Sequence, residues 1–568
     1  MRRSFVIRVR LLSTLIFIAA LFIVFRLYYV QILHGASYKT EVESQYIARA
    51  GPSDDRYDIF FRGREGTLFA AALMESGYKI AINTTVLKNP EKAYDSISQI
   101  VPLDRERFMK SAGKSDDPYE EVAVRVADAS ARMIGDMKIP GVTLVSERWR
   151  VYPRKELAAH TLGFVAFKDD ARVGRYGLER YWEHALAKKS DGLYVNFFAE
   201  IFSNIGAFAR ITENEKGDVV TSLEPTVEQR LEETLKDVAQ KYKSRITGGI
   251  IMDPRDGSVV AMAANPTFDP NTFNTISDPA VFGNPIVESV FEFGSIMKPL
   301  TMAAGIDSGA ITLETKYNDT GCITRDDAKV CNFDGRARGT VPMQEVLNQS
   351  LNTGAAFVAE KVGREKFAQY MLALGMGEET GIDLPGEVPG IISALKGGSA
   401  LDLISASFGQ GVATTPIAMV RALASIANKG VITTPHVADY LRLSTGAQFR
   451  AWAPDERRVF QPESADVVTK MLIGVVDDAL VNGKIKLEHY TVAAKTGTAQ
   501  IAKSGGGYYT DRYLHSFFGY FPAREPRFLI FLFTVEPQGV TYASQTLAEP
   551  FGELTKFLIS YYDIPPDR

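Results

Sequence analysis

Ser295 and Lys298 open an apolar stretch, FEFGSIMKPLTMAAG, whose composition is typical of the start of a helix. Residues three apart share one face of a helix, so the lysine amine can reach the serine hydroxyl. A lysine kept out of water is neutral, and a neutral amine can take the serine proton and free the oxygen to attack an acyl carbon. The pair therefore predicts a serine nucleophile with a lysine as its base.

The same spacing also occurs at Ser111 with Lys114 and at Ser393 with Lys396. The first pair lies in the polar stretch KSAGKSDD and the second lies beside a Gly-Gly turn. Neither pair opens an apolar helical stretch. The choice of Ser295 therefore depends on residues further along the chain.

Two further groups of polar residues come after it. Ser350 and Asn352 stand at the head of another helical stretch, LNQSLNTGAAFVAEKVG, and offer a hydroxyl and an amide two residues apart. A β-type stretch, EHYTVAAKTGTAQI, contains the tetrad Lys495, Thr496, Gly497 and Thr498. A cation, two hydroxyls and a glycine that permits close backbone approach favour carboxylate binding at a strand edge.

The order Ser-x-x-Lys, Ser-x-Asn, Lys-Thr-Gly is the motif set of penicillin-recognising serine enzymes. The spacings are 55 residues from Ser295 to Ser350 and 145 from there to Lys495. With these motifs the chain resembles the class B penicillin-binding proteins, the peptidoglycan D,D-transpeptidases of bacterial division or elongation, over nearly its whole length. Two positions depart from the family pattern, Tyr57 and Ala494, where glycine is commoner. Neither departure removes a chemical group that the mechanism needs.

The resemblance implies a role for each residue of the first two motifs. Ser295 would attack the D-Ala-D-Ala carbonyl of a stem peptide and release the last D-alanine, with Lys298 as general base. Ser350 would pass a proton to the leaving amine, and Asn352 would hold the amide of the donor peptide. A second stem's amine would then resolve the acyl-enzyme as a cross-link.

The resemblance also implies roles for the tetrad at residues 495–498. Lys495 would supply the field that keeps the base neutral, and Thr496 and Thr498 would lie near the terminal carboxylate of the donor, beside Gly497. The backbone N–H groups of Ser295 and Thr498 would form the oxyanion hole. No cofactor and no metal are expected.

The expected fold class is α+β. The predicted parts are a cytoplasmic tail at residues 1–10, a transmembrane anchor at 11–32, a mixed α/β pedestal at 33–235 and a transpeptidase domain at 236–568. The last is expected to be an antiparallel sheet flanked by helices, with a helical subdomain.

The anchor rests on the sequence LLSTLIFIAALFIVF, which follows arginines at positions 2, 3, 8 and 10. Extended to residue 32, the segment reaches the roughly 20 residues that a membrane span needs. No small-residue cleavage site precedes Ser37, which favours an anchor over a cleaved signal peptide. The arginines predict a cytoplasmic N-terminus and an extracytoplasmic bulk at the bacterial plasma membrane.

Composition excludes other classes. The chain has 568 residues with 46% hydrophobic and 23% charged residues, so it is not mainly disordered. A net charge of −4 gives no reason to expect a nucleic-acid partner. The six histidines and two cysteines show no metal-ligand spacing.

The two cysteines, Cys322 and Cys331, bracket ITRDDAKV, which predicts a hairpin turning at Asp326 and Asp327. In that register the cysteines face each other as a non-hydrogen-bonded pair, within reach of a disulfide. Outside the cytoplasm such a bond would act as a structural staple; two unpaired cysteines are the alternative.

Other stretches predict secondary structure without chemistry. Residues 116–137 have helical composition, and GVTLVSERW is β-rich. From residue 217 the pattern predicts a strand, a helix and two strands joined at the turn PRDG. The glycine-rich loop at residues 504–509 is a candidate gate for the active-site groove.

The main prediction is a cross-linking transpeptidase, more typical of division than of elongation. The alternatives are a D,D-carboxypeptidase or β-lactamase-type hydrolase, and a catalytically idle scaffold or β-lactam sensor. Expected partners are stem peptides on lipid-linked nascent glycan, β-lactams, a multi-pass membrane glycan polymerase and division-complex proteins.

Overall fold

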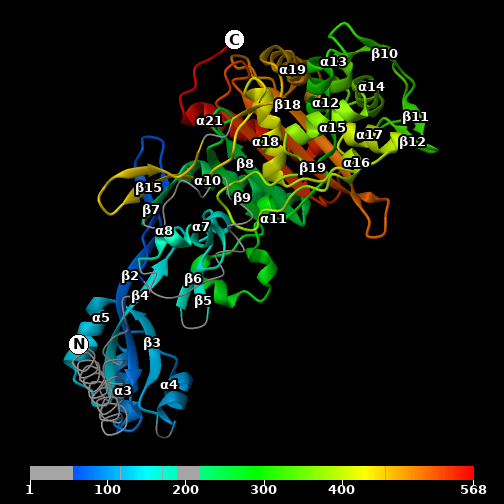
Figure 1. The fold of residues 1–568 in the computed structure, drawn as a ribbon. Coiled ribbons are helices and arrows are strands. Elements are labelled where there is room, and N and C mark those ends of the chain that lie inside the picture. The colour runs from blue at the N-terminus through cyan, green and yellow to red at the C-terminus, as the bar shows by residue number, and fades with distance from the viewer. Residues whose placement is uncertain (1–54, 115–116, 169–170, 189–215, 454–455) are drawn as a thin grey trace, which may run out of the picture. The chain divides into compact units, whose positions relative to one another are not determined.

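The computed structural model describes residues 55–114, 117–168, 171–188, 216–453 and 456–568 (Figure 1). These residues divide into two compact units. The smaller contains residue 55 and residues 75–149, and the larger contains residues 56–74 and those from 150 onward. The predicted tail (1–10) and anchor (11–32) lie outside the described residues. Within the described ranges, no helix has both the length and the apolar character that a membrane crossing requires.

A five-stranded antiparallel sheet forms the centre of the larger unit, in the order β18-β19-β20-β8-β9. Its strands are β8 (Ile246–Met252), β9 (Val259–Asn265), β18 (Ala493–Ala502), β19 (Tyr508–Phe521) and β20 (Phe528–Val535). All eight residues of β20, FLIFLFTV, are buried, because this strand lies mid-sheet and is covered on both faces. The predicted strand pair across PRDG is confirmed as β8 and β9.

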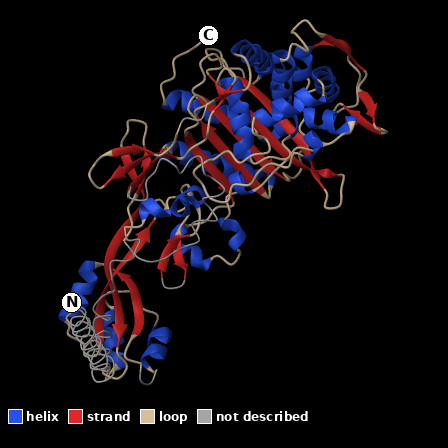
Figure 2. Cartoon of the chain, in the orientation of Figure 1, coloured by secondary structure: helices blue, strands red, loops and turns tan. Residues whose placement is uncertain are grey.

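Two long helices pack on each other and on this sheet, α10 (Pro225–Tyr242) and α21 (Ala548–Tyr561) (Figure 2). The sequence places Glu224 before α10, and its carboxylate accepts hydrogen bonds from the backbone N–H groups of Thr226 and Val227. Pro225 follows at the first helical position, where its missing N–H costs nothing. The helix that the sequence predicts after the strand at residue 217 is confirmed.

A second set of helices carries the predicted site. The helix α12 (Lys298–Asp307) contacts α14 (Asn352–Val362), α18 (Pro416–Ala427) and α19 (Pro462–Gly474). All twelve residues of α18 are buried, as the apolar sequence PIAMVRALASIA requires. Further α-helices of this region are α11 (Pro285–Glu288), α13 (Met343–Asn348), α15 (Arg364–Ala373), α16 (Ser393–Lys396), α17 (Ala400–Ser407) and α20 (Ala543–Thr546).

Shorter strands and helices complete the larger unit. A sheet runs through β16 (Gln448–Arg450), β15 (Ala438–Leu443), β7 (Gly217–Thr221), β1 (Ile59–Arg62) and the first residues of β2 (Leu68–Ile82). Two-stranded pairs are β5 (Val165–Lys168) with β6 (Ala171–Gly174), β10 (Lys316–Asp319) with β13 (Gly339–Pro342), β11 (Cys322–Arg325) with β12 (Ala328–Cys331), and β14 (Val431–Ile432) with β17 (Arg457–Arg458). Short helices are α6 (Ala159–Leu162), α7 (Gly177–Tyr181) and α8 (Glu183–Leu186).

The smaller unit has its own apolar core, which includes Ile80, Ile97, Phe108 and Ile134. Its elements are the later residues of β2, α3 (Pro90–Ser98), α4 (Arg105–Ala112), β3 (Glu120–Val126), α5 (Asp128–Asp136) and β4 (Val142–Val151). The helix expected over residues 116–137 is wrong in its first half. EEVAVRV forms β3 and pairs with β2, because strand pairing outweighs the helical propensity of its Glu, Ala and Arg residues.

Candidate active site

Ser295 lies in a 3-10 turn, Gly294–Met297, that leads directly into α12 at Lys298. The sequence predicted a helix opening here; the structure makes its first turn the tighter 3-10 form. Pro299 stands at the start of α12, where it is tolerated. This geometry places the Lys298 Nζ 2.9 Å from the Ser295 Oγ.

The Lys298 amine is almost fully enclosed, with 1% of the residue exposed. Besides Ser295, it contacts the Ser350 carbonyl oxygen at 2.5 Å, the Ser350 Oγ at 3.1 Å and the Asn352 Oδ1 at 2.8 Å. Burial lowers the pKa of Lys298 well below its usual range, and the charge of Lys495 lowers it further. The amine is therefore arranged to be neutral.

Counting donors and acceptors shows what a neutral Lys298 can do. Its two N–H groups are required by two partners that can only accept, the Ser350 carbonyl and the Asn352 Oδ1. The amide of Asn352 is oriented by its own N–H donation to the Cys331 carbonyl at 2.9 Å. The lone pair of the amine is then left for a hydroxyl, and the Ser295 Oγ is within reach as its donor.

Ser350 connects the two lysines of the site. Its Oγ lies 3.1 Å from the Lys298 Nζ and 3.0 Å from the Lys495 Nζ. The residue has a φ of 53°, an uncommon conformation for a residue other than glycine. It precedes α14, whose first residue is Asn352. Burial lowers the pKa of Lys495 to about 7, so this amine also exchanges its proton near neutrality.

The tetrad of β18 borders the nucleophile segment through backbone contact. A side chain at Gly497 would lie 2.3 Å from the Phe293 carbonyl oxygen, so only glycine allows this approach. The Ser516 hydroxyl, on β19, donates to the same carbonyl at 2.9 Å. The Thr498 hydroxyl accepts from the backbone N–H of Ala543 at 3.1 Å, and Thr496 lies between Lys495 and Gly497 on the strand.

A turn in the segment SASFGQG, residues 405–411, contacts the backbone next to Ser295. The backbone N–H of Gly294 donates to the Gly409 carbonyl at 3.3 Å. A Cβ on Gly409 would lie 2.2 Å from the Gly294 carbonyl oxygen. Phe291 and Thr414 exchange two backbone hydrogen bonds beside it. The segment resembles one that flanks the active site in class B penicillin-binding proteins, but its sequence does not reveal that Gly409 contacts Gly294.

The structure brings together Ser295, Lys298, Ser350, Asn352 and Lys495 in one hydrogen-bonded network. The competing Ser-x-x-Lys pairs lie elsewhere. Ser111 is in α4 of the smaller unit, and Ser393 begins the short helix α16.

The hairpin of the two cysteines has the predicted register, in which Cys322 is opposite Cys331 and Arg325 is opposite Ala328. The two sulfurs form a disulfide, with the Cα atoms 4.0 Å apart. The turn residues Asp326 and Asp327 both have positive φ, as a tight two-residue turn requires.

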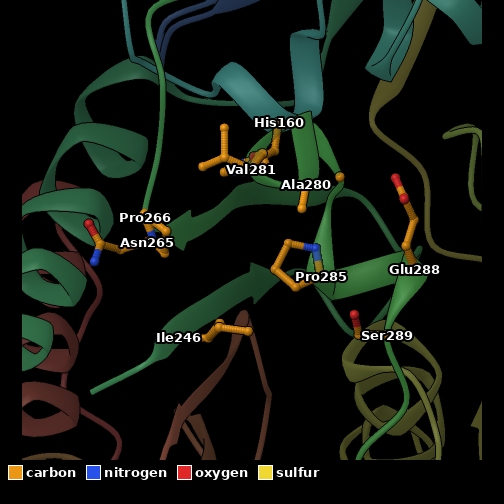
Figure 3. Close-up of a pocket in the computed structure, with 10 residues that line it drawn as sticks. His160, Ile246, Asn265, Pro266, Ala280, Val281, Pro285, Glu288 and Ser289 are labelled. Carbon is orange, nitrogen blue, oxygen red and sulfur yellow. The ribbon is translucent and has the colours of Figure 1, made fainter. Parts of the chain in front are cut away.

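The larger unit also contains a cavity of about 250 Å³ (Figure 3). Its lining includes His160, Asn265, Val281 and Glu288, and none of the motif residues. Burial lowers the pKa of His160 to about 4, so its imidazole is neutral at pH 7, and burial raises the pKa of Glu288. Among the described residues, no cluster of three or more His, Cys, Asp or Glu side chains could hold a metal ion.

Comparison with known proteins gives two family matches. Residues 247–556 match the penicillin-binding protein transpeptidase domain, and residues 64–200 match the penicillin-binding protein dimerisation domain. The first match alone covers more than half of the 568 residues.

Individual relatives are similar over most of their length. Stage V sporulation protein D of Bacillus subtilis is 26% identical over 96% of this chain and 84% of its own. Peptidoglycan D,D-transpeptidase FtsI of Buchnera aphidicola is 22% identical over 99% of this chain and 96% of its own. The crystal structure of penicillin-binding protein 3 from Mycobacterium tuberculosis, complexed with ampicillin, is 25% identical. It matches with a TM-score of 0.65 over 74% of this chain and 91% of its own.

Proposed function

The chain belongs to the penicillin-binding protein transpeptidase family, and on that premise we propose that it is a serine-type peptidoglycan D,D-transpeptidase. One observation carries the chemistry: a buried lysine amine, arranged to be neutral, lies 2.9 Å from the Ser295 hydroxyl. A nucleophile next to such a base is suited to acyl transfer. The relatives named as peptidoglycan D,D-transpeptidases support stem peptides as the substrate.

In the first half-reaction the Ser295 Oγ attacks the carbonyl of the penultimate D-alanine while its proton passes to the Lys298 amine. The negative oxygen of the tetrahedral intermediate is stabilised by the backbone N–H groups of Ser295 and Thr498. As the peptide bond breaks, the leaving amine of the terminal D-alanine takes a proton. That proton travels from Lys298 through the Ser350 hydroxyl, which contacts the amine at 3.1 Å. The products are an ester on Ser295 and free D-alanine.

In the second half-reaction the same groups work in reverse order. The amine of a second stem peptide attacks the ester, loses a proton toward the Ser350–Lys298 pair, and forms the cross-linking amide as the Ser295 oxygen leaves and is reprotonated. Asn352 holds the amide of the donor. Lys495 in its charged form, with Thr496 and Thr498, binds the donor's terminal carboxylate in the first half-reaction.

The cellular setting is part of the proposal. The apolar sequence of residues 11–32, with arginines before it, supports a single-pass anchor in the bacterial plasma membrane. The bulk of the chain would then meet nascent glycan outside the cytoplasm, beside a multi-pass glycan polymerase and division-complex proteins in septal synthesis. Cell fractionation tests the anchor: a chain lacking residues 11–32 should leave the membrane fraction.

Intact-protein mass spectrometry with benzylpenicillin tests the chemistry. The full-length chain should gain one penicilloyl group that persists for many minutes, and Ser295→Ala should gain none. Ser393→Ala, at a competing Ser-x-x-Lys pair, is the matched control and should be acylated normally. Rapid drug hydrolysis without a lasting adduct would support a hydrolase instead, and absence of any reaction would support an idle scaffold.

A further inference from the structure

The side-chain amide of Asn352 is held on two sides. Its Oδ1 accepts from the Lys298 Nζ at 2.8 Å, and its Nδ2 donates to the backbone carbonyl of Cys331 at 2.9 Å. A primary amide has two N–H groups, so one remains after the bond to Cys331 is made. The direction of this remaining N–H is set by the bond that the other one makes.

The backbone carbonyl that orients Asn352 belongs to Cys331, which forms a disulfide. Cys331 is the last residue of β12, and its sulfur is bonded to Cys322 on β11. Each strand of this hairpin has four residues. A two-stranded hairpin of that size is marginal in water without a further constraint.

Asn332 and Thr353, which follow Cys331 and Asn352 in the sequence, also contact each other. The backbone N–H of Thr353 donates to the Asn332 Oδ1 at 3.2 Å, and the Asn332 Nδ2 donates to the buried carboxylate of Asp319 at 3.0 Å. The Thr353 hydroxyl donates to Asp319 at 2.7 Å. The end of β12 thus runs beside the first residues of α14, with the Cys331 carbonyl next to the Asn352 amide.

We propose that the Cys322–Cys331 disulfide is a positioning element of the active site. It holds the Cys331 carbonyl in place, and this carbonyl orients the Asn352 amide so that its second N–H faces the amide carbonyl of the bound donor. The proposal rests on the proposed function, and it gives the bond a role beyond that of a structural staple.

The consequence of breaking the bond is selective. Asn352 keeps its contact with Lys298, and the contact of Lys298 with Ser295 does not involve the hairpin. The loss should therefore fall on ligands that use the second N–H of Asn352. Loss of one neutral hydrogen bond corresponds to roughly a three- to tenfold change in rate.

A matched pair of ligands separates this effect from a general loss of activity. Benzylpenicillin carries a side-chain amide whose carbonyl can accept from Asn352, whereas 6-aminopenicillanic acid has the same nucleus without that carbonyl. The second-order acylation constant of each is measured on the full-length chain with the bond intact and after reduction by dithiothreitol. Each sulfur then gains a proton and the reductant becomes its own cyclic disulfide. The chain has only two cysteines, so the reductant acts on this bond alone.

Two variants accompany the measurement. Cys322→Ser with Cys331→Ser removes the bond without a reductant. Lys329→Ala changes an exposed residue of the same hairpin and leaves the bond in place. The thermal midpoint of each variant and each redox form is recorded, and the reduced wild type is reoxidised and measured again.

We expect reduction, and the double variant, to lower the benzylpenicillin constant about three- to tenfold more than the 6-aminopenicillanic acid constant. Reoxidation should restore the wild-type ratio, and Lys329→Ala should not change it. If the acylation constants of both ligands fall by the same factor, or if neither falls, their ratio is unchanged, and this result would overturn the proposal. Failure of the oxidised wild type to react with benzylpenicillin at all would count against the proposed function instead.

Discussion

Replacing Lys495 by methionine removes one of the two positive charges that the site can hold and leaves a side chain of similar length. Each lysine nitrogen lies within about 3 Å of the Ser350 Oγ, so the two are at most about 6 Å apart. Lys495 is the second cause, after burial, that lowers the pKa of Lys298. Its removal should therefore raise the pKa of Lys298 without returning it to its usual range.

The size of this rise follows from Coulomb's law. Two unit charges about 6 Å apart interact by about 3 kcal/mol at an effective dielectric constant of about 20, which corresponds to about 2 pKa units. Since the pKa of Lys495 is about 7, the residue is only partly charged near neutrality. The pKa of Lys298 should thus rise by about one to two units in Lys495→Met.

The assay is the second-order acylation constant with a fluorescent penicillin, measured from about pH 5 to 9. This constant reports the ionisations of the free enzyme. In the wild type it should rise with pH as Lys298 loses its proton, and fall above about pH 7 as Lys495 loses the charge that we propose binds the ligand carboxylate. In Lys495→Met the rising limb should move to higher pH by about one to two units, and the falling limb should disappear.

The same variant made at Lys503 is the control, because this lysine lies just beyond β18. Lys503→Met should leave both limbs unchanged. A rising limb that does not move in Lys495→Met would refute the reasoning that one lysine sets the proton affinity of the other. A lower maximal rate alone would not support it, since loss of carboxylate binding has the same effect.

Two further predictions concern packing and pH. Gly497→Ala should slow acylation at least about tenfold and lower the free energy of unfolding by about 1–3 kcal/mol, because its Cβ would lie 2.3 Å from the Phe293 carbonyl oxygen. The control is Gly552→Ala, at a helical position with open space, which should leave stability unchanged or raise it slightly. Differential scanning calorimetry measures both stabilities. Glu232 is largely enclosed, and this burial raises its pKa from 4.5 to about 7. The protonated carboxyl therefore contributes its whole stabilisation below about pH 4.5, and this contribution is lost as the pH rises through 7. Glu232→Gln should therefore be more stable than the wild type above about pH 7, by up to about 3 kcal/mol in urea unfolding. The control Glu233→Gln, at an exposed position, should not be more stable. Identical urea-unfolding curves for the wild type and Glu232→Gln at pH 8 would contradict this prediction.

The motif residues could be found from sequence because their chemistry restricts them. Only a few residue types can act as a nucleophile, a base or a carboxylate-binding cation, and their order along the chain indicated one family. The hairpin of Cys322 and Cys331 was equally accessible, since two acidic residues at its centre fix the turn and thereby the register. Patterns that depend on side-chain type and spacing were thus sufficient for these elements.

Contacts made by backbone atoms were not accessible in this way. The Cys331 carbonyl that orients Asn352, and the approach of Gly409 to Gly294, involve atoms that every residue possesses. A glycine in the sequence shows that a close approach is possible but does not name the partner. The strand β3 was missed for a related reason, because its pairing with β2 depends on residues 38 to 48 positions earlier in the chain.

The conformation of Ser350 depends both on the chemistry of its side chain and on contacts of its backbone. Its carbonyl accepts from Lys298 while its hydroxyl contacts both lysines, and these contacts require two atoms of one residue to face the same side. A φ of 53° allows this, although glycine or asparagine would adopt it at lower cost. Neither of those residues supplies a hydroxyl that can both accept and donate a proton. In the proposed mechanism the proton path between Lys298 and the leaving amine passes through this oxygen. On that proposal, the chemistry requires a serine at a position where local backbone preference alone would select another residue.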